Sequence, residues 1–391
     1  MHRVFYRHES HAMTKTQHPE FHLDSQIIHL NHAAVAPWPQ RTVNAVANFA
    51  RENGAVGSTN YLHWLTIEKT LKKQLKQLIN APSINDIALV KNTSEALSFV
   101  AYGLNWNSGD NIVSSNIEFP SNRIPWQSLK NQGVEFRQTD LQQDKTPEAS
   151  LFSNVDKNTR LITISSVQFA AGQHLDLEMI GDFCQQHGIL FCIDAIQSLG
   201  AIKFDVQRYQ ADFVMADGHK WMGGPGGLGV FYSRPDSRKR LKLTQFGWHM
   251  IKDTHDYENQ PWEAHSTAQR FECGSPNMLG IHALSASLSV LLEVGMDTVE
   301  QQLLANARYL ASEIQQHKQL LLLSASPTQL NSGIVLFKPK TLTKQRLFNY
   351  LQNKQVLCAM RGDGIRFSPH FYNTLDQLKH ALTLVDEATT L

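Results

Sequence analysis

Short apolar runs alternate with helical patterns between about residue 40 and residue 235. This alternation is typical of βαβ units, which build a parallel or mostly parallel sheet with helices on its faces. Strands are expected at 87–90, 111–115, 160–166, 189–193, 212–216 and 228–233. The pattern therefore predicts an α/β fold whose sheet holds about seven strands, a usual size for a large α/β domain.

Helical periodicity fills the spaces between these strands. A helix is expected at 64–79, where apolar residues share one face and Glu68 and Lys72 form an i,i+4 pair on another. Another helix is expected at 177–187, because its pattern stops directly before Gly188.

The pattern changes after residue 280. Long amphipathic helices are expected at 280–294 and 297–317, followed by short strands and a last helix that begins with a capping box of Thr374 and Gln377. No Pro/Gly/Ser-rich linker separates the two parts, so a smaller C-terminal α+β domain is expected to pack on the first domain. The predicted division is a tail at 1–23, a large domain at 24–279 and a small domain at 280–391.

The tail has no apolar region of the kind that a secretory signal needs, and no stretch of the sequence is apolar for long enough to span a bilayer. Its histidines lack the paired spacing of metal ligands on a helix, so no metal site is expected there. We expect a flexible tail, with Met13 as an alternative start, on a cytoplasmic enzyme.

Charge and cysteine content narrow the function classes. The chain has 391 residues, with 36 Lys and Arg against 35 Asp and Glu. This balance argues against a nucleic-acid or anionic-membrane binder, because such proteins concentrate basic residues to neutralise phosphates. The four cysteines form neither CxxC pairs nor a dense framework, which predicts free thiols in a reducing compartment.

The candidate chemistry lies at the ends of two expected strands. Asp194 ends a hydrophobic strand, where its side chain would point into the crevice in which α/β enzymes keep their ligands. Lys220 follows the next strand, and a lysine amine that is desolvated beside a sheet edge has a lowered pKa and can form a Schiff base. An ordinary buried ion pair is the alternative. The glycines at 223–229 do not form a Walker A loop, because the lysine precedes them.

The segments DAIQSLGA and ADGHKWMGGPGGLGVFY resemble the cofactor-lysine region of class V aminotransferases. These are pyridoxal-phosphate enzymes of fold type I, and the group includes cysteine desulfurases and isopenicillin-epimerase-like proteins. The resemblance covers roughly residues 28–375. It implies that Lys220 holds pyridoxal 5'-phosphate as an internal aldimine, that Asp194 binds the pyridine nitrogen, and that Gln197 binds the phenolic oxygen. A carboxylate at that nitrogen keeps the ring cationic and able to accept electrons.

Phosphate binding is assigned to the turn at Thr93 and Ser94, because N–H groups at a helix start favour an anion. The same residues are also a good capping sequence without a ligand. The resemblance adds His219 to the phosphate site. It also implies that Ser275 reaches the phosphate of a partner subunit, so that the enzyme is a homodimer.

The resemblance further implies that Phe119 stacks on the cofactor and that Gln168, or its neighbour Phe169, contacts the cofactor oxygen. Arg366 would bind the α-carboxylate of an amino acid substrate, since a guanidinium grips a carboxylate bidentately; an exposed strand arginine is the alternative. Arg361 is a weaker candidate for a second anionic group. Asn31 lies in a segment that resembles the family's substrate channel.

Transamination of an amino acid is the favoured reaction at this point. The alternatives are a cysteine or selenocysteine desulfurase, another pyridoxal-phosphate lyase or epimerase, and a non-catalytic protein of the same fold. A desulfurase needs a mobile nucleophilic thiol. Cys358 lies in a strand pattern close before Arg366, and Phe119 stands where desulfurases have a histidine, so the sequence favours transamination.

Overall fold

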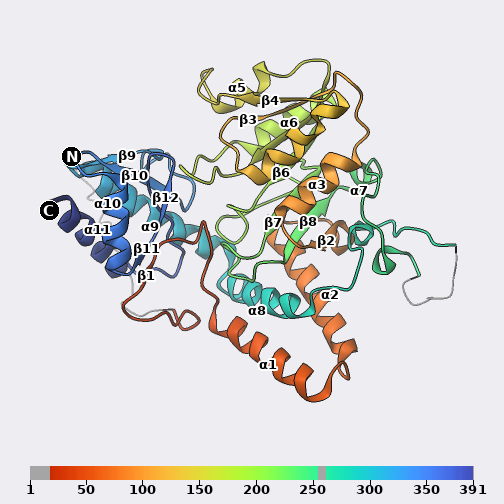
Figure 1. The fold of residues 1–391 in the computed structure, drawn as a ribbon, viewed down its shortest axis with the longest axis horizontal. Coiled ribbons are helices and arrows are strands. Elements are labelled where there is room, and N and C mark those ends of the chain that lie inside the picture. Colours follow the sequence, from red (N-terminus) through yellow and green to blue (C-terminus); the bar gives the residue numbers. More distant parts are fainter. Residues whose placement is uncertain (1–17, 254–260, 391) are drawn as a thin grey trace, which may run out of the picture.

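The computed structural model describes residues 18–253 and 261–390, and its centre is a seven-stranded sheet (Figure 1). From edge to edge the strands are β2 (Ile87–Val90), β8 (Gly229–Ser233), β7 (Phe213–Asp217), β6 (Leu190–Asp194), β5 (Thr159–Ser165), β3 (Asn111–Ser115) and β4 (Glu135–Thr139). β8 is antiparallel to both neighbours, and the other pairs are parallel. The predicted α/β fold with a mostly parallel sheet of seven strands is confirmed.

β4 is the strand that the sequence pattern missed. Its residues, EFRQT, include a single apolar side chain, and Glu135 and Gln138 are exposed. β4 is an edge strand, so it does not need the continuous apolar run by which the buried strands were found.

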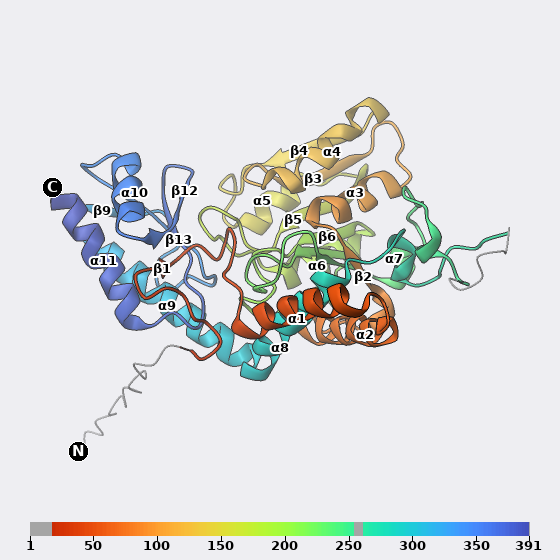
Figure 2. The ribbon, with the colours of Figure 1, turned by 60° about the horizontal axis from the view of Figure 1, so that its bottom comes forward.

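Helices cover both faces of this sheet (Figures 1 and 2). The longer helices of this part are α1 (Gln40–Val56), α2 (Tyr61–Leu78), α3 (Thr93–Gly103), α6 (Leu177–His187) and α8 (Met278–Val294), and the shorter ones are α4 (Ile124–Gln127), α5 (Pro147–Ser153) and α7 (Pro235–Arg238). α3 packs on the face that holds Phe213 and Met215, whereas α2, α6 and α8 pack on the face that holds Val214 and Ala216. Alternate residues of β7 therefore fill two different cores.

The C-terminal part forms an antiparallel sheet with helices around it (left in Figure 1). Its strands, in order, are β12 (Ala359–Arg361), β13 (Gly364–Phe367), β10 (Val335–Pro339) and β9 (Leu320–Leu322), and its helices are α9 (Met296–Gln316), α10 (Lys344–Asn353) and α11 (Leu375–Thr390). β1 (Ile28–His29) pairs with β11 (Val356–Leu357), so the N-terminal segment joins this part of the molecule.

The predicted helices correspond to α2, α6, α8 and α9, with ends that differ by up to three residues. The capping box of α11 is confirmed, because the backbone N–H of Gln377 donates to Thr374 Oγ1 at 3.3 Å and the backbone N–H of Thr374 donates to Gln377 Oε1 at 3.1 Å. α8 and the first turns of α9 pack in the core of the large sheet, while later residues of α9 pack in the C-terminal core. α9 therefore joins the two cores.

The predicted tail at 1–23 lies mostly outside the described residues, which begin at His18. Within the described part, Phe21 is buried and stacks on Tyr372, with ring centroids 3.6 Å apart. This end of the tail is thus packed against the C-terminal part.

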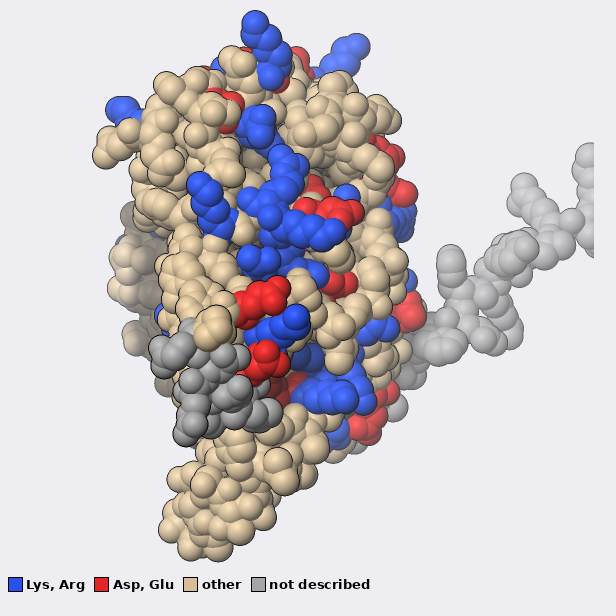
Figure 3. Space-filling model, turned by 90° about the vertical axis from the view of Figure 1, so that its right-hand side faces the viewer, with Lys and Arg blue, Asp and Glu red and all other residues tan. Residues whose placement is uncertain are grey.

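The helices and the surface charge can be compared with those of membrane and nucleic-acid binders. In the described part of the chain, no single helix is long and apolar enough to cross a membrane; α8 and α9 meet that test only as a pair, and the pair is bent by 84°. A band of Lys and Arg side chains, broken by Asp and Glu, crosses the right-hand face of the molecule (Figure 3). The mixture of signs agrees with the near-zero net charge.

Candidate active site

Asp194 and Lys220 lie at the same edge of the large sheet. Asp194 is the last residue of β6, and Lys220 follows the end of the neighbouring parallel strand β7. Both residues are buried: Asp194 is 1% exposed and Lys220 is 8% exposed. Burial raises the pKa of Asp194 and lowers the pKa of Lys220, and the charge of each partner opposes the other's shift. The site thus holds a desolvated amine of the kind that forms Schiff bases.

Phe119 lies beside this amine. Lys220 Nζ is 5.6 Å from the centroid of the Phe119 ring, and Phe119 packs edge-on against Phe169 at a centroid distance of 5.2 Å. Phe119 is 39% exposed. It therefore offers an open aromatic face next to the lysine, where a planar ring can stack.

Two of the residues predicted to bind the phosphate, Thr93 and His219, each have a buried polar atom without a hydrogen-bond partner. Thr93 is the first residue of α3 and is buried, yet its Oγ1 has no hydrogen-bond partner. Ser94 is exposed, and its hydroxyl donates to Ser121 Oγ at 2.9 Å. His219 Nδ1 lies 3.1 Å from Asp217 Oδ1, but the geometry does not make a hydrogen bond. A buried, unpaired hydroxyl at a helix N-terminus is suited to an anion.

Arg366 is a buried cation without a carboxylate partner among the described residues. It lies on β13 and is 1% exposed. Its Nη1 donates to the carbonyl of Phe169 at 2.5 Å, its Nη2 donates to Asn31 Oδ1 at 3.4 Å, and its Nε has no partner. Burial, aided by the charge of Arg361, lowers the pKa of Arg366 to about 9. The exposed-strand alternative is wrong, and the burial of this charge favours an anionic ligand.

Arg361 and Asn31 flank this guanidinium. Arg361 lies on β12, is half-buried, and donates from Nη1 to the carbonyl of Met360 at 2.8 Å. Its charge also lowers the pKa of Lys220. The structure therefore brings Asn31, Arg361 and Arg366 to the site of Lys220, while a second anionic group on the substrate stays a prediction.

The model of the family "Aminotransferase class-V" matches residues 28–380. The chain belongs to this family. Similar sequences include a probable cysteine desulfurase of Methanothermobacter thermautotrophicus, 27% identical over 376 residues that cover 90% of this chain and 92% of the relative. A cysteine desulfurase of Klebsiella pneumoniae is 29% identical over 321 residues, covering 80% of this chain and 77% of the relative.

Solved structures share the class V fold. The cysteine desulfurase of Thermococcus onnurineus NA1 aligns with a TM-score of 0.82 at 23% identity, covering 94% of this chain and 96% of that one. The cystine C–S lyase C-DES, in complex with its product cysteine persulfide, aligns with a TM-score of 0.86 at 22% identity, covering 93% and 98%. A C-DES variant carries glycine covalently linked to its pyridoxal-phosphate cofactor.

Pyridoxal 5'-phosphate is the cofactor of the chain, and the residues at the sheet edge fit it. Lys220 would hold it covalently, Asp194 would face its ring nitrogen, and Thr93 with the start of α3 would take its phosphate. When bound, its ring withdraws electrons from the substrate and makes the α-proton acidic.

The two glutamines assigned to class V cofactor contacts also serve the protein itself. Gln197 Nε2 donates to the carbonyl of Ala33 at 3.1 Å, and its Oε1 accepts from Trp221 Nε1 at 2.7 Å. Gln168 Oε1 accepts the backbone N–H groups of residues 170 and 171, and its Nε2 donates to a carbonyl at position 117. Each amide keeps one N–H for a ligand, so both cofactor roles stay predictions.

Glu118 is a site residue that the sequence analysis missed. It is buried, and its carboxylate accepts hydrogen bonds from Ser115 and Asn122 and from both the backbone and the hydroxyl of Ser165. Burial raises the pKa of Glu118, and its charge raises the pKa of Asp194. A polar residue directly before Phe119, which is predicted to stack on the cofactor, was the available signal.

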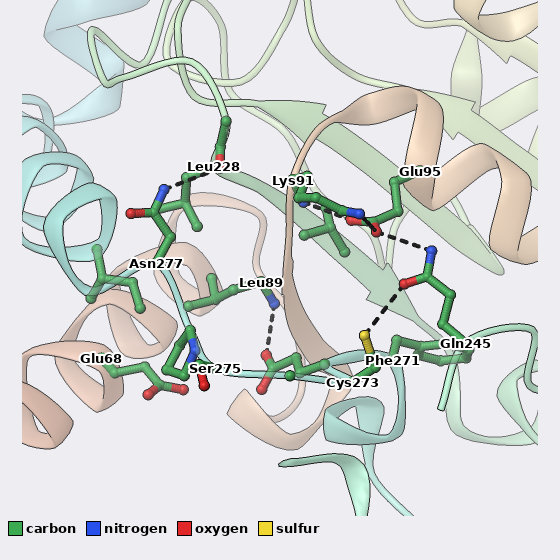
Figure 4. Close-up of a pocket in the computed structure, with 16 residues that line it drawn as sticks. Glu68, Leu89, Lys91, Glu95, Leu228, Gln245, Phe271, Cys273, Ser275 and Asn277 are labelled. Carbon is green, nitrogen blue, oxygen red and sulfur yellow. Dashed lines mark hydrogen bonds and ion pairs between the residues drawn. The ribbon is translucent and has the colours of Figure 1, made fainter. Parts of the chain in front are cut away.

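Ser275 lies in another cavity, of about 250 Å³ (Figure 4). The cavity is also lined by Lys91, Glu95 and Cys273, but by neither Lys220 nor Asp194. Lys91 and Glu95 flank the start of α3, so the cavity opens near the predicted phosphate site. A contact of Ser275 with a partner's phosphate, and with it the homodimer, stays a prediction.

A cluster of ionisable groups lies beside this cavity. One ligand atom each of Glu68, His249 and Glu272 lies within 4.8 Å of the others, a spacing that suits a metal ion. However, Lys72 Nζ lies 2.8 Å from Glu272 and 3.4 Å from Glu68. The ammonium of Lys72 already supplies the positive charge that these carboxylates need.

Proposed function

We propose that the protein is a pyridoxal-phosphate-dependent carbon–sulfur lyase that acts on cysteine or on a disulfide of cysteine. The relatives named above are cysteine desulfurases, and one structural neighbour is a cystine C–S lyase. These names favour the desulfurase and lyase alternative of the sequence analysis over transamination. They do not separate a desulfurase, which stores sulfur on its own cysteine, from a lyase, which releases it.

Our choice between these two reactions rests on the accessibility of the cysteine thiols of the chain. Cys358 is 5% exposed, and its sulfur accepts a hydrogen bond from Gln352 Nε2 at 3.6 Å. Burial raises the pKa of the Cys358 thiol to about 12. A thiol in this state is a poor nucleophile, and it lies between two short strands rather than on a mobile loop.

The remaining cysteines offer no better candidate within the described residues. Cys184 and Cys192 are buried, and burial raises the pKa of both thiols. Cys273 is half-buried, but it lines the cavity of Figure 4 and its thiol faces Gln245 at 3.4 Å. We therefore infer that the sulfur leaves with the product instead of passing to a protein cysteine.

The residues of the site divide the work of such an elimination. Arg366 binds the substrate carboxylate and so orients the bonds at Cα. Lys220, as a free amine, takes the α-proton; the electron pair forms a double bond to Cβ, and the Cβ–S pair leaves with the sulfur. The released enamine hydrolyses to pyruvate and ammonia. Asp194 would stabilise positive charge on the ring nitrogen of the bound cofactor.

The nature of Phe119 favours a disulfide substrate. A phenyl ring cannot protonate the departing sulfur, so Phe119 gives no help to a strongly basic leaving group. A less basic sulfur anion leaves faster. The persulfide released from a disulfide is less basic than the sulfide released from cysteine, which makes a cysteine disulfide the better substrate.

The test is a product assay of the cofactor-loaded protein with L-cystine and with L-cysteine, comparing the wild type with Cys358→Ser and Cys273→Ser. We expect pyruvate and a persulfide product from L-cystine, at rates within about twofold of the wild type in both variants, since no thiol of the protein takes part. Loss of turnover only in Cys358→Ser would make the enzyme a desulfurase. A sulfur-containing keto acid without pyruvate would restore transamination.

A further inference from the structure

All four carbonyl groups of residues 219–222, the turn that carries Lys220, accept hydrogen bonds, and three of the four donors come from distant parts of the chain. The carbonyl of His219 accepts from the backbone N–H of Ala36, and that of Lys220 accepts from Gly223, each at 2.9 Å. The next two carbonyls accept from side chains: Trp221 from His370 at 3.0 Å and Met222 from Ser287 at 2.5 Å. The backbone under the lysine is therefore held by the N-terminal segment, by α8 and by the C-terminal part.

Trp221 is clamped on both sides. It is 1% exposed, and its indole N–H donates to Gln197 Oε1 at 2.7 Å. A Cβ added to Gly333 would lie 2.7 Å from the edge of this indole, and one added to Gly200 would lie 2.5 Å from the Trp221 carbonyl. Both neighbours approach too closely to accept a larger residue. The position of Trp221 is thus set from the large sheet and from the C-terminal part together.

The hydrogen bonds of His370 define its tautomer. Because the Trp221 carbonyl can only accept, Nε2 of His370 carries the proton and donates. Nδ1 then accepts the backbone N–H of Phe371 at 2.8 Å. Burial keeps this ring neutral, since it lowers the pKa of His370 to about 4. Every polar atom of the imidazole is used, and one of them is used on the lysine turn.

His370 and Arg366 belong to one short segment that leaves β13. Between them, Ser368 is fixed on the N-terminal segment: its hydroxyl accepts from the Ala33 N–H at 3.1 Å, and its carbonyl accepts from His32 Nδ1 at 2.8 Å. The segment therefore touches the carboxylate-binding position at one end and the lysine turn at the other, with no free residue between them that would absorb a movement.

We propose that His370 is a positioning residue, which ties the turn of Lys220 to the segment of Arg366, so that binding of the substrate carboxylate fixes the lysine amine for proton transfer. A shift of Arg366 toward a bound carboxylate moves Ser368 and His370 with it. His370 passes this shift through the Trp221 carbonyl to the residue next to Lys220. Proton transfer is sensitive to such small displacements. The proposal needs a carboxylate on the substrate and no particular fate of its sulfur.

The variants His370→Asn and His370→Gln test the hydrogen bond alone. The amide of Asn can replace the Nδ1 acceptor but does not reach the Trp221 carbonyl, whereas the amide of Gln brings an N–H close to the position of Nε2. For His370→Asn we expect kcat to fall about tenfold with KM changed less than about twofold, and for His370→Gln a loss below about threefold. Cofactor-free His370→Asn should also gain the visible absorption of bound cofactor about tenfold more slowly, because its lysine is misplaced.

His29→Leu is the matched control. His29 is a buried imidazole of the same cluster, 4.6 Å from His32 between ring centroids, and its pKa is likewise lowered by burial to about 4. None of its side-chain hydrogen bonds goes to the lysine turn. We expect it to lower the thermal stability while leaving the rate of cofactor uptake within about twofold. Equal slowing in His29→Leu and His370→Asn, or in His370→Gln and His370→Asn, would overturn the proposal.

A measurement on the unaltered protein guards against variants that do not fold. Nitrogen NMR of the histidine side chains should show His370 as the neutral tautomer protonated on Nε2. Protonation on Nδ1 would contradict the hydrogen bond to Trp221. If the product assay showed no carbon–sulfur cleavage, the results expected for the His370 variants and for the histidine NMR would stay the same. Any reaction of the site that begins at the α-proton uses the same lysine.

Discussion

Lys72 and Lys220 are both buried, but their surroundings shift the pKa values of the two amines in opposite directions. Burial alone would lower the pKa of Lys72, yet Glu272 at 2.8 Å and Glu68 at 3.4 Å outweigh it, and the pKa is raised. For Lys220, burial lowers the pKa; Asp194 opposes this shift, while Arg366 and Arg361 add to it. The pKa shift of Lys72 favours its ammonium form, whereas the pKa of Lys220 is lowered to about 8, so this amine loses its proton more readily.

The comparison separates a structural ion cluster from a reactive site by whether the buried polar groups have partners. The Lys72 cluster has two carboxylates for one ammonium, and the three groups satisfy each other. Around Lys220, the carboxylates of Asp194 and Asp217 act on the lysine together with two arginines, and Thr93 Oγ1 and Arg366 Nε lack partners. A buried arginine without an ion pair and unpaired buried donors favour an anionic ligand. In our proposal, the cofactor phosphate and a substrate carboxylate would supply the negative charge.

The largest expected effect is that of Lys220→Ala. Without this amine the cofactor has no covalent anchor and the α-proton has no base, so turnover should fall by at least about a thousandfold while the protein still folds. Absorption of bound cofactor and pyruvate release measure this loss. A variant that keeps its covalent cofactor would break the assignment of Lys220.

Lys72→Met is the control for that variant. It leaves Glu68 and Glu272 buried without their cation, which should lower the free energy of unfolding by about 3 kcal/mol. Covalent cofactor attachment should persist. Denaturant unfolding and the visible spectrum together distinguish the two lysines, and a loss of attachment in Lys72→Met would erase the difference between them.

Arg366→Gln should have the next largest effect. The substrate carboxylate then loses its charged partner in a buried place, and we expect kcat/KM to fall about a hundredfold, from the loss of about 3 kcal/mol of charge-assisted hydrogen bonding. Cofactor affinity should stay unchanged. The matched variant Arg361→Gln, whose guanidinium is half-buried, should lose less; the reverse order would exchange the roles of the two arginines.

A third kind of buried group, neutral histidine, gives a pH dependence. Burial lowers the pKa of both His29 and His370 to about 4, while the unfolded chain keeps ordinary values near 6.5. Below pH 6.5 the unfolded state therefore binds more protons than the folded state. The free energy of unfolding decreases as the pH is lowered, and it levels off near pH 4. Each imidazole contributes a loss of about 3 kcal/mol. Unfolding at stepwise lower pH measures this, and His29→Leu should flatten the curve; an unchanged slope would refute it.

The smallest effect is expected at an exposed lysine. Lys91 is 2.9 Å from Glu95, but 70% of its side chain is exposed. Water screens such a pair, so Lys91→Ala should change the free energy of unfolding by less than about 1 kcal/mol. Denaturant unfolding beside Lys72→Met measures the contrast, and equal losses in the two variants would show that burial is not what distinguishes these lysines.

The site residues that lie at the ends of strands could be predicted from the sequence. Asp194 and Lys220 follow apolar runs whose direction in a parallel sheet is fixed, so their meeting could be predicted, and the family motifs added Thr93 and Arg366. β4 could not be found in the same way, because an edge strand needs no apolar run.

Contacts between distant segments were beyond the sequence. Glu272 reaches Lys72 across 200 residues, and His370 reaches Trp221 across 149. Neither pair leaves a local pattern, since each depends on how α8 and the C-terminal part pack on the large sheet. Glu118 was missed for the same reason: its donors come from a neighbouring strand, β5, as well as from its own loop.

The most direct test of this account is to locate the covalent cofactor. Holoprotein reduced with borohydride, digested and mapped by mass spectrometry should carry the pyridoxyl group on Lys220 alone. Labelling of Lys72, or of any other lysine in place of Lys220, would contradict the assignment of the site.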